Sequence, residues 1–171
     1  TGIRERRISA PGEDSLVLAE NAALDCLNHS KYDPGQIEML IYSGITKYVD
    51  GLKHLYEPAL SLLLKKRLGC EGAISFDITN ACAGMLSALH IANDFIERGE
   101  VKNCLVVSGE YISSLSLNAI EHISSSDDLQ IASLTLGDAG GAAILSRSWA
   151  GDGLASSKFV TFGEHSDLCI A

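Results

Sequence analysis

A cysteine with small neighbours stands where an apolar run gives way to a helical pattern. In "FDITNACAGMLSALHIANDFIERGE", residues 76–100, Cys82 is flanked by Ala81, Ala83 and Gly84. Small neighbours allow a sharp turn that leaves the sulfur accessible, and the free N–H groups at a helix start favour a thiolate over a thiol. The pattern therefore makes Cys82 a candidate nucleophile. A free cysteine is more often a small core residue, and the residues alone leave that alternative open.

Glu57 directly precedes a second predicted helix. Pro58 suits the first turn of that helix and Gly69 suits its end. The ordinary role of a carboxylate in this place is to stabilise the helix N-terminus, by about 0.3–1 kcal/mol. The basic run "LKKRLG" ends the same helix. It is most simply a solvated end that complements the helix dipole, and it is also a candidate contact for an acidic carrier protein.

The elements around these residues alternate between strands and helices. Short apolar runs predict buried strands, and apolar residues at helical spacing predict helices. Such alternation indicates βαβ units and an α/β fold with a mostly parallel sheet covered by helices. The predicted helices are 14–28, 58–69 and 85–99, and the predicted strands are 38–46, 72–78, 103–110, the run after the glycine turn in "LGDAGGAAILSRS", and 153–163. Residues 111–130 lack a clean period over their second half and are predicted to be a surface excursion.

Composition excludes some classes of function. The formal net charge of −9 lacks the basic footprint of a nucleic-acid-binding protein. No apolar run approaches the roughly 18 residues that span a bilayer, so we expect no membrane segment. A mean hydropathy of +0.16 favours burial of part of the surface against another chain. The chain has five cysteines, Cys26, Cys70, Cys82, Cys104 and Cys169. Their odd number and the lack of CxxC spacing favour a reduced, cytoplasmic protein.

Three segments together resemble one enzyme family. "DITNACAGMLSALHIANDFIERGEVKNCLVVSGE" is similar to the nucleophile region of the thiolase-fold condensing enzymes, in the β-ketoacyl-acyl-carrier-protein synthase III branch. "TGIRERR" resembles the early arginine-containing segment of that branch, and "GDAGGAAILSRS" resembles its glycine-rich turn and following strand. Cys82 aligns with the acyl-accepting cysteine. In the family, the glycines that match Gly137, Gly140 and Gly141 let backbone pass close to the nucleophile turn.

The resemblance implies a fold, a reaction and partners. Residues 1–171 would be the N-terminal thiolase-like half-domain, incomplete at both ends, and one of two pseudo-repeats. Cys82 would accept an acyl group from coenzyme A, and a malonyl or acyl thioester, on coenzyme A or an acyl carrier protein, would then undergo Claisen condensation. The resemblance implies a homodimer and no cofactor or metal. Glu57 resembles the glutamate that, in enzymes joining two long acyl chains, reaches the partner subunit's site.

The same resemblance leaves two other functions open. A histidine and an asparagine from the second half complete the family's active site, and no position here matches either. The chain is therefore also a candidate for a non-catalytic or split partner subunit. A cysteine thioester hydrolase would need a His-paired thiolate. His90 lies two helical turns after Cys82, about 12 Å along the axis, too far to be the direct base. We expect His29, His122 and His165 to be solvated, and His54 is left unassigned.

Overall fold

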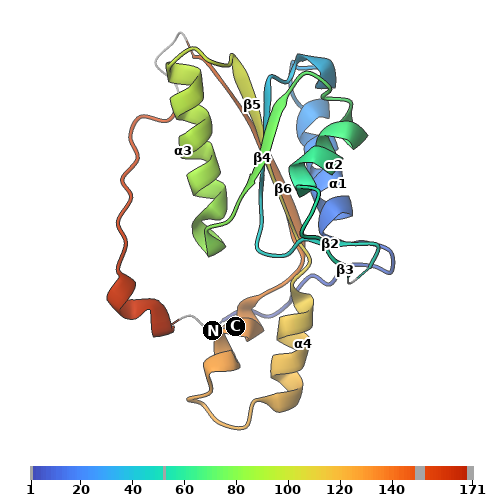
Figure 1. The fold of residues 1–171 in the computed structure, drawn as a ribbon. Helices are drawn as coiled ribbons and strands as arrows, with labels where there is room; N and C mark the ends of the chain where they lie inside the picture. The colour runs from blue at the N-terminus through green and yellow to red at the C-terminus, as the bar shows by residue number, and fades with distance from the viewer. Residues whose placement is uncertain (1, 52, 149–152, 169–171) are drawn as a thin grey trace.

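The computed structural model describes residues 2–51, 53–148 and 153–168, and its centre is a four-stranded sheet (Figure 1). The strand order is β4-β1-β5-β6. The strands β4 (Ile74–Ile78), β1 (Met39–Ser43) and β5 (Asn103–Glu110) are parallel, and β6 (Ala139–Ser146) is antiparallel to β5. The prediction of a mostly parallel sheet is confirmed. Tyr48–Val49 (β2) and Lys53–His54 (β3) pair in a separate two-stranded sheet.

Helices cover both faces of the central sheet (Figure 1). On one face, α1 (Ser15–Asn28) and α2 (Leu60–Leu68) bury Leu16, Leu27 and Leu64 against Leu40 and Leu105 of the central strands. On the other face, α3 (Gly84–Glu97) packs Ala88, Ala92 and Ile96 against Met39, Ile41 and Val106. Because β1 is apolar on both faces, all five of its residues are buried. The sheet therefore separates two apolar layers, as the sequence predicts.

Two glycines let α1 lie directly on the sheet. Gly109 of β5 and Gly140 of β6 are cross-strand partners. A Cβ at Gly109 would collide with the backbone of Ser15 and Ala19, and a Cβ at Gly140 would collide with the Leu18 carbonyl. The glycine motif therefore brings α1 onto the strands.

This contact differs from the one expected for the glycine motif. The sequence predicts close approach to the nucleophile turn, but Gly137 lies nearest to the backbone of Arg7, and a Cβ at Gly141 would meet open space. Gly137, Gly140 and Gly141 do line the same cavity as Cys82, so the motif faces the site without touching the turn closely.

Three other expectations are corrected. Residues 111–130 contain the helix α4 (Ser113–His122) rather than only a surface excursion. Pro58 precedes α2, which begins at Leu60 with Ala59 as its N-cap. The predicted strand at 153–163 is not formed, because α3 stands between this segment and the sheet and leaves it no strand to pair with (Figure 1).

The carboxylate of Asp138 holds the start of α4. Asp138 Oδ1 accepts hydrogen bonds from the N–H groups of Ile112 and Ser113, both at 2.7 Å, at the start of α4. Its Oδ2 accepts from the Ser113 hydroxyl and from the N–H of Ser9. Burial raises the pKa of Asp138, but these hydrogen bonds outweigh burial and hold the pKa below its usual value. One side chain thus joins β6, α4 and the N-terminal segment.

We predict that Asp138→Asn lowers the free energy of unfolding by about 2 kcal/mol at pH 7, because an amide nitrogen then faces N–H donors. A lowered native pKa contributes stability above the unfolded pKa, near 3.9, and that stability is lost as the pH falls through the native value. The difference between the two proteins should therefore shrink below about pH 4. Urea unfolding at pH 7 and pH 3 measures it, with Asp127→Asn as the exposed control. An equal difference at both pH values would contradict this role.

Candidate active site

Cys82 lies in a tight turn between β4 and α3. Residues Ala81–Ala83 form a single 3-10 turn, and α3 begins at Gly84. The predicted strand-to-helix junction is confirmed, although the helix starts two residues after the cysteine. Ala81 has a φ of +42°, a left-handed conformation that costs a non-glycine residue roughly 1–2 kcal/mol. Such backbone strain beside a reactive group is typical of functional turns.

A second glycine contact fixes the position of this turn. Gly84 is buried, and a Cβ there would collide with the Ser43 hydroxyl at the end of β1. The start of α3 can therefore lie against the end of β1 only because residue 84 has no side chain. Asn80 Nδ2 donates to Ser87 Oγ at 2.9 Å, and Ser87 Oγ donates to the Ala83 carbonyl at 3.0 Å. These bonds tie the turn to the first turn of α3.

Among the four free cysteines in the described part of the chain, the Cys82 thiol alone is exposed. Burial raises the pKa of the Cys70 thiol, and it raises the pKa of the Cys104 thiol to about 12. Burial also raises the pKa of Cys26, which is half-buried. Cys169 lies outside the described residues. The core alternative left open by the sequence is therefore wrong for Cys82, whereas Cys70 and Cys104 are buried.

A cavity of about 400 Å³ opens beside Cys82 at the carboxyl ends of the parallel strands. Its lining is mainly apolar or small, as binding sites for organic groups usually are. The strand ends contribute Ser43, Gly44, Ser108 and Glu110, the nucleophile turn and α3 contribute Ala81, Cys82 and Met85, and Ile45, Ile112, Leu136, Gly137, Ala139, Gly140 and Gly141 complete the wall. An acyl group attached to Cys82 would have apolar surface to contact.

Glu110 is a site residue that the sequence analysis missed. Its carboxylate accepts hydrogen bonds from Ile45 N at 2.6 Å, Thr46 N at 3.0 Å and Thr46 Oγ1 at 2.7 Å. The donors lie 64 or 65 residues away in the chain, so no local pattern marks the residue. With three donors bound, Glu110 serves to hold the loop that follows β1 in the cavity wall.

Glu57 is exposed and is not among the residues that line the Cys82 cavity of its own chain. Its segment is nevertheless tied to the nucleophile strand. Asp77 of β4 accepts hydrogen bonds from Leu60 N and Ser61 N, at the start of α2, and from Lys47 Nζ at 2.7 Å. Burial raises the pKa of Asp77, but these bonds outweigh it and keep the pKa below the usual value. Asp77 therefore fixes the helix that begins three residues after Glu57.

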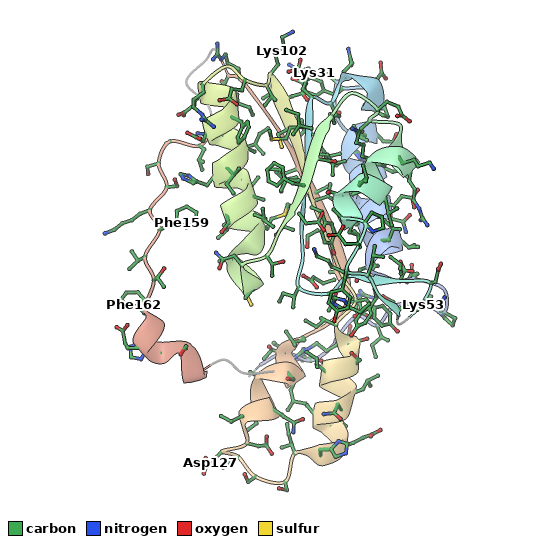
Figure 2. The ribbon with its side chains drawn as sticks, in the orientation of Figure 1. Lys31, Lys53, Lys102, Asp127, Phe159 and Phe162 are labelled. Atoms are coloured by element: carbon green, nitrogen blue, oxygen red, sulfur yellow. The ribbon has the colours of Figure 1, made fainter. Side chains whose placement is uncertain are left out.

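The histidines do not complete a catalytic pair in the described residues. The cavity lining contains no histidine among the residues that the structure describes. His90 contacts the segment beside α3, where its Nδ1 lies 2.8 Å from Ser157 Oγ and its ring packs on Phe159 (Figure 2). His54 packs between Tyr48 and Tyr56. His29, His122 and His165 are exposed, as expected.

Comparison with known proteins agrees with this geometry. Residues 76–163, slightly more than half of the chain, match the family model of 3-oxoacyl-[acyl-carrier-protein] synthase III. The chain belongs to this family. A synthase III from Streptomyces lividans is 36% identical over 115 residues, and one from Ehrlichia canis is 31% identical over an alignment that covers 98% of the chain.

Solved structures confirm the predicted thiolase-like fold. The cerulenin-bound co-crystal of OleA from Xanthomonas campestris superposes with a TM-score of 0.73 at 27% identity, covering 85% of this chain and 44% of OleA. The priming β-ketosynthase of the R1128 polyketide pathway superposes with a TM-score of 0.70 at 34% identity, covering 86% of this chain and 40% of that one. The two sequence relatives are covered over 32% and 48% of their lengths. The chain thus spans about a third to about half of the lengths of these two relatives. No helix within the described residues is long and apolar enough to cross a membrane.

We predict that a limiting amount of iodoacetamide labels Cys82 before the other thiols. The reason is that Cys82 is exposed, whereas burial protects Cys70 and Cys104 and raises their pKa values. Peptide mapping by mass spectrometry at several times measures the order of labelling. Cys82→Ser serves as the control, since it should remove the fast phase. Faster labelling of Cys26 or Cys104 would contradict the assignment.

Proposed function

We propose that this chain supplies the acyl-accepting half of a synthase III-type condensing enzyme, with Cys82 as its nucleophile. The observation that carries the proposal is an exposed thiol at the start of α3, on the wall of a cavity, inside the stretch that matches the family model. Residues 1–171 act in this proposal as the N-terminal half-domain. The substrates are acyl-coenzyme A and a malonyl or acyl thioester, the second carried by coenzyme A or an acyl carrier protein.

The acyl transfer follows from the position of the thiol. The Cys82 thiolate attacks the thioester carbonyl carbon and forms a tetrahedral intermediate, whose collapse breaks the bond to the coenzyme A sulfur and leaves an acyl-cysteine. The leaving thiolate takes a proton from solvent. The N–H groups of Ala83 and Gly84 already bond to the Asn80 and Ala81 carbonyls, so we assign the Cys82 N–H as a donor to the oxyanion. The reaction uses no metal or organic cofactor.

Condensation needs groups beyond the described cavity. A second thioester must lose a proton or carbon dioxide to give a carbanion, and its negative charge must be stabilised while it attacks the acyl-cysteine carbonyl. In the proposal these tasks belong to the histidine and asparagine of the complementary half. The absence of a described histidine from the cavity wall supports this division, and it disfavours the thioester-hydrolase alternative, which needs a base beside the sulfur.

The proposed assembly is a cytoplasmic homodimer in which Glu57 reaches the partner's site. Glu57 is exposed and lies on a segment fixed by Asp77, which is compatible with a role outside its own subunit. Four free cysteines among the described residues fit a reducing compartment. A split, non-catalytic partner subunit is the alternative, and the two proposals differ in whether Cys82 becomes acylated.

We predict no measurable condensation product from the chain alone, and product when a polypeptide with the family's second half is supplied. Losing positioned acid–base and hydrogen-bonding groups costs on the order of 10²–10⁴-fold in rate per group. Product analysis after incubation with acyl-coenzyme A and malonyl thioester measures this. Cys82→Ala should abolish product in the complemented enzyme, Glu57→Gln should reduce it, and Cys26→Ser is the matched cysteine control.

The outcomes separate the alternatives. Rapid turnover by the chain alone would show that one of its own groups acts as the base. Thioester hydrolysis without condensation, in the presence of the second half, would favour the hydrolase. Full activity of Cys82→Ala in the complemented enzyme would overturn the proposal.

A further inference from the structure

The loop that follows β1 presents one apolar side chain to the Cys82 cavity. This loop, residues 44–46, contributes Gly44 and Ile45 to the lining. Ile45 is 43% exposed, although it lies among elements that bury most of their apolar residues. Because Ile45 and Cys82 line the same cavity, the exposed part of the Ile45 side chain is available to contact a group bound there.

The backbone on both sides of Ile45 has hydrogen-bond partners on three side chains. Glu110 accepts from the N–H groups of Ile45 and Thr46. The Tyr42 hydroxyl lies 2.9 Å from the Thr46 carbonyl oxygen, and Thr79 Oγ1 donates to the Gly44 carbonyl at 3.2 Å. The N–H groups of Ile45 and Thr46 and the Gly44 carbonyl therefore have side-chain partners on β5 and just after β4, and the Tyr42 hydroxyl on β1 lies near the Thr46 carbonyl.

Gly44 adds a steric constraint to these bonds. It is buried, and a Cβ at this position would collide with the Tyr42 ring. Tyr42 itself is buried, and its hydroxyl also lies 2.8 Å from the Gly109 carbonyl oxygen. The loop is thus packed against a buried aromatic ring, and its side-chain contribution to the cavity lining comes from Ile45.

We infer that Ile45 is a specificity-determining residue, which limits the size of the group that can reach and occupy the space beside Cys82. Under the proposed function, on which this part of the inference rests, that group is the acyl chain, so Ile45 would restrict acyl-chain length. A rigid loop gives a size limit, whereas a mobile one would adapt to each substrate. Differences of one or a few carbon atoms in such pockets change rates by about 10-fold or more.

Two reagent series test the inference separately. N-methylmaleimide and N-octylmaleimide alkylate a thiolate without needing acyl transfer: the sulfur adds to the ring double bond and the adjacent carbon takes a proton. Acyl-coenzyme A from two to twelve carbons tests the proposed substrate. Intact-protein mass spectrometry gives the rate of each modification at Cys82 for the wild type, Ile45→Ala and Ile45→Phe. Ile120→Ala, at an exposed isoleucine on α4 outside the cavity lining, is the control.

Ile45→Ala should raise the octyl-to-methyl rate ratio by about 10-fold, Ile45→Phe should lower it by a similar factor, and Ile120→Ala should leave it unchanged. The preferred acyl chain should lengthen and shorten in the same order. A ratio that is equal in all four proteins would overturn the inference, even if Cys82 is acylated. A shifted maleimide ratio with no acylation by any acyl-coenzyme A would support the size limit and refute the proposed function. Since Ile45 is half-exposed, both variants should fold.

Discussion

Three carboxylates accept hydrogen bonds from backbone N–H groups around the carboxyl ends of the parallel strands. Asp77 binds the start of α2, Glu110 binds the loop after β1, and Asp138 binds the start of α4 and the N-terminal segment. A buried N–H without a partner costs about 1–3 kcal/mol, so these loops depend on the three side chains for their positions. The depressed pKa values of Asp77 and Asp138 are the electrostatic consequence of the same bonds.

This constraint turns a common α/β sheet into a defined site. The loops held by Glu110 and Asp138 form the cavity wall, and the Gly84–Ser43 approach places the nucleophile turn against it. Cys82 is consequently exposed at the cavity while its neighbours in sequence are anchored. Preorganisation of this kind lets a reactive group meet its substrate without first ordering its surroundings.

Much of the fold could be predicted from local pattern. Residues 103–110 contain the apolar run 104–107, and the strand predicted there forms β5 with those same bounds. Asp14 caps α1 as its residue type suggests, by accepting a hydrogen bond from Val17 N. The junction at Cys82 was also visible, because small residues between a strand and a helix permit only a few backbone paths. The role of Glu57 in catalysis stays a prediction, since it depends on a partner subunit.

The missed features depend on contacts between distant parts of the chain. Asp138 and Ser9 are 129 residues apart, so neither the helix cap nor the buried carboxylate has a sequence signature. In the sequence, Glu110 is simply a charged residue at the end of a predicted strand. Only the fold brings the N–H donors of Ile45 and Thr46 to its carboxylate. Residues 153–163 show the opposite error: an apolar, β-prone segment forms no strand, because pairing requires a free neighbouring edge.

The most direct test of the central claim is to find where an acyl group attaches. The chain would be incubated with isotope-labelled acetyl- or octanoyl-coenzyme A, digested under mildly acidic conditions that preserve thioesters, and mapped by tandem mass spectrometry. We predict that the labelled acyl group lies on Cys82 and is removed by hydroxylamine, as a thioester should be. Labelling of Cys26 or of a serine, or an unlabelled Cys82 in a folded protein under complemented conditions, would contradict the account.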